Sequence, residues 1–271
     1  MPELPEVETT LQGIKRHLKK NKVTEIIIRH PRLRWPIPTD LPNYITNQTV
    51  KKMSRRGKYI LFEFATGTMI LHLGMSGRVR VLEERLPPQK HDHVDIYFDN
   101  KKYLRFTDPR RFGALLWTSA DPAKHPLLAH LGPEPLTSAF DGTYLKKQAG
   151  KRKAPIKSFI MDSKMVVGVG NIYATEALFR AKILPQTAAG DISLASYKKL
   201  AAEIKAVLSE AIEQGGTTLK DFTKSDGSPG YFSIKLKVYG RGGKPCLRCG
   251  TILTLIRQGQ RSTVFCGKCQ K

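Results

Sequence analysis

Apolar residues at the start of the chain recur at the spacing of a helix. Within residues 7–20, Val7, Leu11, Ile14 and Leu18 are four, three and four positions apart, which places them on one helical face. The residues between them are mostly polar or charged. The pattern therefore predicts an N-terminal helix with one buried side.

Between residues 23 and 118 the pattern changes to short apolar runs separated by turn signals. The predicted strands are residues 23–28, 59–64, 68–72, 79–82, 94–98, 103–106 and 114–118. The turn signals include Arg56-Gly57, Thr66-Gly67 and Asp99-Asn100. Strands of this length and spacing predict a β-sandwich or a β-barrel.

The second half of the chain carries a helical pattern. The connection to this helical half lies between two segments, Gly132 to Pro135 and the basic run from Lys151 to Lys153. Its clearest predicted helices are residues 173–181 and 193–214, and the second carries an apolar stripe that belongs to the core. Strands followed by helices predict an α+β fold.

All four cysteines lie in the last 26 residues, as two C-x2-C pairs with sixteen residues between them. The ligands are Cys246, Cys249, Cys266 and Cys269. This spacing is typical of one tetrahedral structural Zn²⁺ site. Two disulfides are the alternative, and a reducing cytosol opposes them. Residues 251–256 and 261–265 read as strands with Gln258 to Gln260 as the turn, so we expect a zinc-bound β-hairpin with Arg261 near its tip.

The charge balance indicates the class of partner. The chain has 46 Lys plus Arg against 23 Asp plus Glu, a formal net charge of +23. A positive field of this size favours polyanions, and nucleic acid is the leading interpretation. A solvated basic face and an anionic membrane surface are the alternatives. No apolar run is long enough to span a bilayer and no secretory signal is present, so we expect a cytoplasmic protein.

The N-terminus contains candidate covalent chemistry. Removal of Met1 makes the ring nitrogen of Pro2 a secondary α-amine, a fraction of which is neutral and nucleophilic near pH 7. Such an amine forms an iminium with an aldehyde carbon. Glu3 and Glu6 are close enough in sequence to donate or shuttle a proton. The structural alternative is that these residues only mark the start of a helix.

Two glycine-containing loops carry large side chains that could enter a nucleic-acid duplex. Residues 73–77 place Met75 between glycines, and residues 108–113 place Arg110 and Phe112 on a turn. Apolar side chains on such turns wedge between base steps, although methionine more often fills a core gap. Two such loops in one basic protein favour the interpretation that the protein opens a nucleic-acid duplex.

Two further motifs have weaker interpretations. Gly168 to Asn171 precedes a helix but lacks the third glycine of a dinucleotide fingerprint, so a phosphate-binding turn and an ordinary helix start both remain open. The run His91 to His93 suggests a metal site, but no third ligand cluster lies nearby in the sequence. Hydrogen-bonding roles are favoured there.

Taken together, six motifs resemble those of the bacterial formamidopyrimidine-DNA glycosylases. They are Pro2-Glu3-Leu4-Pro5-Glu6-Val7-Glu8-Thr9, Arg56-Gly57-Lys58-Tyr59, His72-Leu73-Gly74-Met75-Ser76-Gly77, Asp108-Pro109-Arg110-Arg111-Phe112-Gly113, Gly168-Val169-Gly170-Asn171-Ile172-Tyr173 and the four-cysteine hairpin. The resemblance implies an N-terminal catalytic β-sandwich domain (1–132), a linker and helix-two-turn-helix DNA-binding domain (133–235) and a zinc finger (236–271). It also implies that DNA binds in the cleft between the halves.

The resemblance further implies a reaction and a partner. The reaction is excision of oxidised purines such as 8-oxoguanine and formamidopyrimidines from duplex DNA, followed by β,δ-elimination through a Schiff base on Pro2. Leu4 favours this substrate class, since the sister endonuclease VIII group usually has glycine there. The implied protein is a monomeric, nucleoid-associated base excision repair enzyme of the bacterial cytoplasm with one structural zinc.

By the same resemblance, each motif residue acquires a role. Pro2 is the nucleophile, Glu3 protonates the sugar ring oxygen and Glu6 is a supporting acid. Met75, Arg110 and Phe112 fill the gap left by the flipped nucleotide, with Arg110 facing the orphaned cytosine. The phosphate-gripping positions are Lys58, His72, Asn171, Tyr239 and Arg261, of which Lys58 and Arg261 are grouped with the catalytic residues. Two of the matched positions, Lys58 and His91, lie beside the damaged nucleotide. Lys157 matches a further position near the base or its phosphate.

Residues 217–230 match the mobile loop that closes over the extruded base. A hypothesis of another class fits much of the same sequence: a zinc-containing protein that recognises damaged DNA without cutting it. The charge, the two loops and the hairpin suit both interpretations. Only Pro2 and Glu3 distinguish them.

Overall fold

The computed structural model of the chain describes residues 2–215 and 236–271, so the loop predicted at residues 217–230 lies outside the described residues. The chain divides into two compact units. The first comprises residues 1–129 with 214–231, and the second comprises residues 130–213 with 232–271. Each unit is described here by itself.

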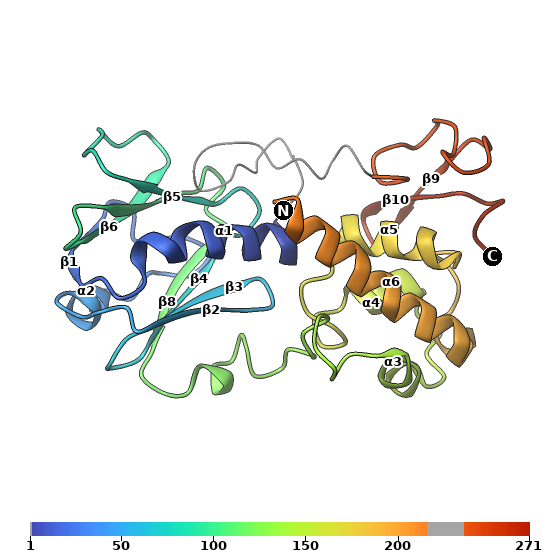
Figure 1. The fold of residues 1–271 in the computed structure, drawn as a ribbon, viewed down its shortest axis with the longest axis horizontal. Coiled ribbons are helices and arrows are strands. Elements are labelled where there is room, and N and C mark those ends of the chain that lie inside the picture. The colour runs from blue at the N-terminus through green and yellow to red at the C-terminus, as the bar shows by residue number, and fades with distance from the viewer. Residues whose placement is uncertain (1, 216–235) are drawn as a thin grey trace. The chain divides into compact units, whose positions relative to one another are not determined.

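The first unit is built around two four-stranded antiparallel sheets (Figure 1). The sheets have the strand orders β1-β6-β7-β5 and β2-β3-β4-β8. The strands are β1 (Val23–Ile28), β2 (Lys52–Arg56), β3 (Tyr59–Glu63), β4 (Thr68–His72), β5 (Arg78–Leu82), β6 (Asp92–Phe98), β7 (Tyr103–Thr107) and β8 (Ala114–Thr118). Every strand predicted from the sequence is present, and β2 is additional. The short helix α2 (Leu41–Ile45) and the 3-10 turn η1 (Pro122–Lys124) lie in connections of this unit.

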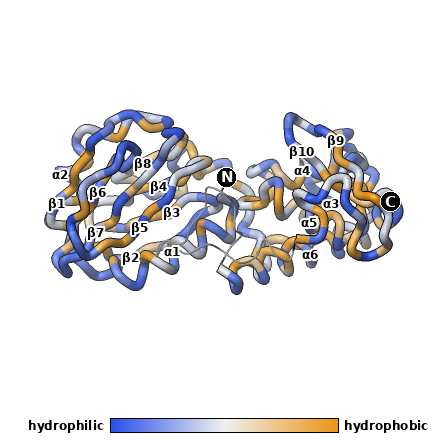
Figure 2. The backbone as a smooth tube through the Cα atoms, turned by 90° about the horizontal axis from the view of Figure 1, so that it is seen from above, coloured by the Kyte–Doolittle hydropathy of each residue, from blue (hydrophilic) through white to orange (hydrophobic). Residues whose placement is uncertain are grey.

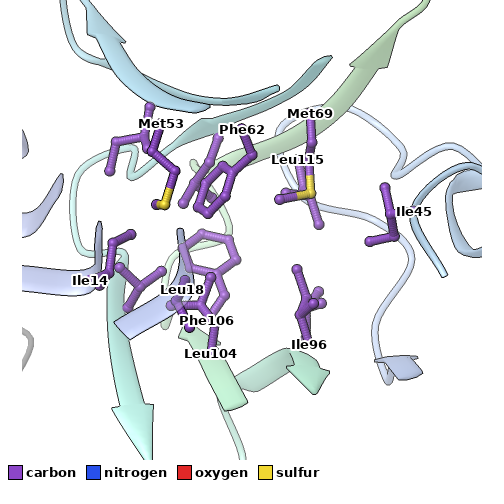
Figure 3. Packing of buried hydrophobic residues seen from close by; sticks show 14 of the residues in the cluster. Ile14, Leu18, Ile45, Met53, Phe62, Met69, Ile96, Leu104, Phe106 and Leu115 are labelled. Carbon is purple, nitrogen blue, oxygen red and sulfur yellow. The ribbon is translucent and has the colours of Figure 1, made fainter. Parts of the chain in front are cut away.

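Both sheets and the N-terminal helix α1 (Leu4–Leu18) contribute to one apolar core. Figure 3 shows Ile14 and Leu18 of α1 with Met53 and Phe62 of one sheet and Phe106 of the other. Each fully buried apolar side chain of this size stabilises the fold by about 1.5–3 kcal/mol. This shared core holds the N-terminus of α1 against the β-sandwich.

The helix α1 begins three residues earlier and ends two residues earlier than residues 7–20, the range that its apolar period predicts. Pro5 lies in the first turn, where a proline costs the helix no hydrogen bond because the first backbone N–H groups have no partner within the helix. Glu3 is the N-cap residue. The Pro-Glu-rich start of the chain is therefore the first turn of the helix.

The second unit combines helices with a C-terminal β-hairpin. Its elements are α3 (Gly142–Ala149), α4 (Ile156–Met161), α5 (Asn171–Ala181), the 3-10 turn η2 (Ala189–Asp191), α6 (Leu194–Glu213), β9 (Thr254–Gln258) and β10 (Arg261–Phe265). The helices predicted at residues 173–181 and 193–214 are α5 and α6. Apolar and polar residues mix along these helices (Figure 2), and no helix of residues 2–215 or 236–271 is long and apolar enough to cross a membrane.

The hairpin has a tighter turn than the sequence predicts. Arg261 pairs with Gln258, so the turn consists of two residues, Gly259 and Gln260, where we expected three. Both have positive φ, at 53° and 60°, as the turns that match the twist of two antiparallel strands require. The turn places Arg261 directly after the hairpin tip.

Candidate functional site

The two N-terminal glutamates form a reciprocal hydrogen-bonded pair at the start of α1. The Glu3 carboxylate accepts the backbone N–H of Glu6, and Oε2 of Glu6 accepts the backbone N–H of Glu3 at 2.8 Å. Both side chains are buried, with exposures of 3% for Glu3 and 0% for Glu6. Glu3 and Glu6 therefore do mark the start of a helix, as the structural alternative predicts. This leaves the chemical role open, because the same contacts hold the Glu3 carboxylate in one place.

Pro2 precedes Glu3 and is buried as well. Its nitrogen and the Glu3 carboxylate thus belong to adjacent residues at the fixed end of a helix. This adjacency is compatible with a nucleophile and an acid that act on the same substrate. The Pro2, Glu3 and Glu6 candidates are brought together by one element.

Lys58 lies in the two-residue turn between β2 and β3, after Gly57 with φ of 58°. Arg55 fixes this turn, since its guanidinium donates to the Gly57 carbonyl at 2.9 Å and to Glu8 of α1 at 2.7 Å. Arg55 thus connects the turn that carries Lys58 to the helix that carries Glu3. No local sequence pattern predicts this contact between residues 47 positions apart.

His72 ends β4 and pairs with Tyr59, the residue that follows Lys58. Burial lowers the pKa of His72 to about 4, aided by the positive charges of Lys58 and Arg34. Nδ1 accepts the backbone N–H of Gly74 at 3.0 Å, so the proton of the neutral ring is on Nε2. His72 is therefore a neutral hydrogen-bond donor at pH 7.

We expect His72 to titrate near pH 4 in an NMR titration of its ring nitrogens. Because the folded pKa is below the ordinary value of 6.5, the unfolded chain takes up the proton first, and the free energy of unfolding falls between pH 6.5 and about 4. The fall is at most about 1.4 kcal/mol per pH unit. His72→Gln should remove this contribution. A midpoint near 6.5 would contradict the buried, neutral ring.

The two loops with candidate wedge residues lie at the same end of the β-sandwich. Residues 73–77 connect β4 to β5, and residues 108–113 connect β7 to β8, so both cross from one sheet to the other. The pairs His72–Ala114 and Arg78–Thr107 place the ends of these loops beside each other. The sequence predicts each loop, but not that they are neighbours.

The wedge candidates reach the surface of these loops. Phe112 is 45% exposed and Arg110 is exposed, with its guanidinium carbon 4.9 Å from the centre of the Phe112 ring. Met75 is half-buried. Phe112 is one of several large apolar side chains exposed among the described residues, and a single one is ordinary on a protein surface. The arrangement is compatible with side chains that enter a stack of nucleic-acid bases.

His91 and His93 take hydrogen-bonding positions. Nε2 of His93 donates to the Asp108 carbonyl at 2.8 Å, and the His91 carbonyl accepts the Asp108 N–H at 3.0 Å. Asp92 accepts the hydroxyl of Thr107. Among the described residues, only the four cysteines form a group able to hold a metal. The metal alternative for residues 91–93 is therefore not supported.

In the second unit, Asn171 and Lys157 converge on the hairpin. The Asn171 amide donates to the Ser262 carbonyl at 3.1 Å, and the buried Lys157 ammonium donates to the same carbonyl at 3.2 Å and to Thr263 Oγ1 at 2.6 Å. Arg261, next to Ser262, is exposed. Lys157, Gln258 and Arg261 line one pocket. Three of the predicted DNA-binding positions therefore meet at the hairpin tip.

The turn before α5 has the geometry of a helix start with a glycine N-cap. Gly168 has φ of 81°, and Gly170 is the N-cap of the helix that begins at Asn171. No strand occurs between α4 and this turn. A dinucleotide fingerprint requires a strand at that place, so this interpretation is wrong. A phosphate-binding role for the N–H groups remains a prediction.

Glu176 of α5 is a residue that the sequence analysis missed. Its buried carboxylate accepts three successive backbone N–H groups, from Lys237, Val238 and Tyr239, at distances of 2.8 to 3.1 Å. Tyr239 is thereby fixed to the helix that begins with Asn171. An acidic residue within the apolar run of α5 is the sequence signal that could have identified it.

The four cysteine sulfurs lie within 4.8 Å of one another, from two separate knuckles of the hairpin. Hydrogen bonds from Thr251 lower the pKa of Cys249, whereas burial raises the pKa of Cys269. The cysteines also form part of a small apolar cluster with Phe179, Val238, Leu253 and Val264. Four thiols at this separation fit one tetrahedral Zn²⁺ ion.

Comparison with known proteins accounts for nearly the whole chain. Residues 1–115 match the formamidopyrimidine-DNA glycosylase N-terminal domain, residues 131–223 match the H2TH domain of the same proteins, and residues 243–271 match a zinc finger found in FPG and IleRS. Formamidopyrimidine-DNA glycosylases of Methylococcus capsulatus and Pseudomonas entomophila are 54% and 57% identical, over 100% of this chain and of theirs.

The chain belongs to the formamidopyrimidine-DNA glycosylase family. Solved structures of family members agree with this assignment. A Lactococcus lactis mutant protein in complex with a Fapy-dG containing DNA has a TM-score of 0.92 and 33% identity over 100% of both chains. The protein of Thermus thermophilus has a TM-score of 0.89 and 34% identity, covering 99% of this chain and 98% of its own.

Family membership also settles the cofactor. The zinc-finger match spans Cys246, Cys249, Cys266 and Cys269, and the four thiols are gathered as such a finger requires. The glycosylase chain therefore has one structural zinc, which cross-links the two knuckles. The α+β fold predicted from the sequence, with its N-terminal sheets, helical region and cysteine hairpin, is confirmed.

Proposed function

We propose that this protein is a bifunctional DNA glycosylase and AP lyase of base excision repair that removes oxidised purines from duplex DNA. The observation that carries the proposal is the placement of Pro2 and Glu3 together at the fixed start of α1, in a chain of this family. Relatives in the solved structures are bound to Fapy-dG containing DNA and to DNA with an abasic site. These are a substrate and an intermediate of the proposed reaction.

In the first chemical stage, the bond from C1′ to the base is exchanged for a bond from C1′ to the Pro2 nitrogen. With Met1 removed, the Pro2 nitrogen attacks C1′ of the sugar, the N–C1′ bond forms and the bond from C1′ to the base breaks. The base leaves with a proton. Glu3 then protonates the ring oxygen, the C1′–O4′ bond opens and the iminium forms. Dividing one difficult substitution into covalent steps lowers each barrier.

The second stage cuts the strand. Loss of a C2′ proton expels the 3′ phosphate by β-elimination, and a further elimination expels the 5′ phosphate. Water hydrolyses the remaining iminium and regenerates the Pro2 amine. Glu6 supports both stages because its carboxylate holds the Glu3 backbone N–H.

Access to the base requires the nucleotide to leave the stack, at a cost of a few kcal/mol. Met75, Arg110 and Phe112 fill the vacated space, and Arg110 donates to the orphaned cytosine. Lys58, His72 and His91 lie beside the damaged nucleotide and its phosphates. Asn171, Tyr239 and Arg261 grip further phosphates, with Lys157 supporting the hairpin that carries Arg261.

The partner is duplex DNA, which suits a net charge of +23. We propose a monomer that acts at the nucleoid in the bacterial cytoplasm. We also propose the division of labour already stated for residues 1–132, 133–235 and 236–271, with catalysis in the first part and DNA grip in the other two. A damage-binding protein without catalysis is the competing function.

Borohydride trapping separates the two functions. We expect a covalent adduct with a duplex containing 8-oxoguanine opposite cytosine, and peptide mapping should place it at Pro2, since borohydride reduces the iminium to a stable amine. Trapping on an abasic duplex but not on the 8-oxoguanine duplex would retain the lyase and contradict the substrate. Tight binding without an adduct on either duplex would favour the non-catalytic protein.

A further inference from the structure

The carboxylate of Asp108 connects the two wedge loops. Asp108 is fully buried, and its Oδ1 accepts the hydroxyl of Ser76 at 2.9 Å. Its Oδ2 accepts the backbone N–H of Gly113 at 2.7 Å. Ser76 belongs to the loop 73–77, whereas Gly113 ends the loop 108–113. Hydrogen bonds to a buried carboxylate are among the stronger ones in proteins.

Ser76 extends this connection to the wedge residues themselves. Its Oγ, which donates to Asp108, also accepts the backbone N–H of Arg110 at 3.3 Å. Ser76 follows Met75 directly in the sequence and is 7% exposed. One hydroxyl therefore fixes the position of Arg110 relative to Met75.

The backbone of Asp108 is anchored independently of its side chain. Its N–H donates to the His91 carbonyl at 3.0 Å, and its carbonyl accepts Nε2 of His93 at 2.8 Å and the N–H of Arg111 at 3.2 Å. These contacts come from β6, the segment before it and the loop itself. The carboxylate is thus held in place by the β-sandwich.

The two loops also pack backbone against backbone. Gly74 has φ of 65°, and a Cβ atom at this position would lie 2.3 Å from the carbonyl carbon of Phe112 and 2.4 Å from the nitrogen of Gly113. No side chain fits between them. The loop that carries Met75 and the loop that carries Phe112 therefore cannot move independently over more than a small distance.

We propose that Asp108 and Ser76 are positioning residues that join the loops 73–77 and 108–113 into one rigid wedge, so that Met75, Arg110 and Phe112 enter the duplex as a unit. Selection of the base opposite the lesion then depends on Ser76 as well as on Arg110. This inference rests on the proposed function. Asp108 and Ser76 are buried, so the proposal assigns them no contact with the substrate or the reacting atoms.

The test measures single-turnover excision of 8-oxoguanine opposite cytosine and opposite adenine. Arg110→Ala should reduce the cytosine-to-adenine rate ratio by about tenfold, since a specific base contact is lost. Ser76→Ala should reduce the same ratio by about threefold or more, because the backbone of Arg110 loses its support. The ratio is internal to each preparation, so it does not depend on the fraction of folded protein.

The double variant Ser76→Ala with Arg110→Ala distinguishes a joint action from two separate ones. If Ser76 acts through Arg110, the double variant has the ratio of Arg110→Ala alone. Multiplication of the two single effects would overturn the proposal. An unchanged ratio in Ser76→Ala beside a reduced one in Arg110→Ala would overturn it too, and would leave the proposed function intact.

Thr107→Val is the matched control. Thr107 directly precedes the loop 108–113, but its buried hydroxyl donates to Asp92 of β6 and not to a residue of either wedge loop. We expect its rate ratio to equal that of the unchanged protein. If it falls as in Ser76→Ala, the effect is general loosening of the β-sandwich and the proposal fails. If Arg110→Ala itself leaves the ratio unchanged, Arg110 does not read the opposite base, and both the proposal and that part of the proposed function fail.

Discussion

We expect that replacing Pro2 by Gly or Glu3 by Gln abolishes base excision and leaves DNA affinity largely intact. An iminium formed on a secondary amine has no N–H to lose and keeps its positive charge, which drives the eliminations; a primary amine at position 2 loses this property. Gln at position 3 cannot protonate the ring oxygen. Loss of a positioned proton donor alone costs about 10²–10⁴-fold in rate. Single-turnover excision and equilibrium binding to a duplex with a stable abasic-site analogue measure the two effects separately.

The structure argues that Glu3→Gln does not act by unfolding the helix. A glutamine oxygen can still accept the Glu6 N–H at the N-cap, and the lost charge at a helix N-terminus costs at most about 2 kcal/mol at a buried position such as this one. Glu63→Gln, the same change at an exposed position of β3, is the control and should excise normally. Retained excision in both Pro2→Gly and Glu3→Gln would refute the mechanism.

We expect removal of zinc to unfold the C-terminal hairpin and to weaken DNA binding by at least about tenfold, because structural zinc supplies folding free energy on the order of 10 kcal/mol. The apolar cluster of the hairpin is small, and Leu247, Ile252 and Leu255 are each more than half exposed. Without the metal, little remains to hold Arg261 in place. Titration of a labelled duplex before and after chelation measures the loss.

Restoring zinc should restore the affinity, which controls for damage caused by the chelator. Far-UV circular dichroism should change by only the contribution of the hairpin, since the core of the β-sandwich lies in the first unit. Undiminished binding after verified removal of the metal would contradict a hairpin that contacts DNA.

Short apolar runs between turn signals identified most of the strands, because strands such as β4, β6 and β7 are buried along nearly their whole length. The predicted bounds of β1, β4, β8 and β10 agree with the structure. Strand β2 was missed because its sequence Lys52–Arg56 is mostly basic and has one fully buried apolar residue, Met53. The helices α3 and α4, of eight and six residues, are too short to show a clear period.

The motifs located the candidate site residues, but not the contacts that fix them. Asp108 and Ser76 are 32 positions apart, and Glu176 and Tyr239 are 63 apart. Each of these contacts depends on the packing of the whole unit, and no local pattern encodes it. The buried Lys157 ammonium is a similar case, since lysine in a basic chain is expected at the surface.

The assignment of side chains to the two units has a consequence for how such a protein can change. In the proposed mechanism the residues that act on the reacting bonds, Pro2, Glu3 and Lys58, belong to residues 1–129, whereas three proposed phosphate-gripping residues, Asn171, Tyr239 and Arg261, belong to the second unit. Substitutions that tune attachment to the substrate can accumulate in the second unit without disturbing bond chemistry in the first. Part of the proposed grip on DNA is thus separable from the proposed bond chemistry, whereas His72 and the two wedge loops keep another part of that grip in the first unit.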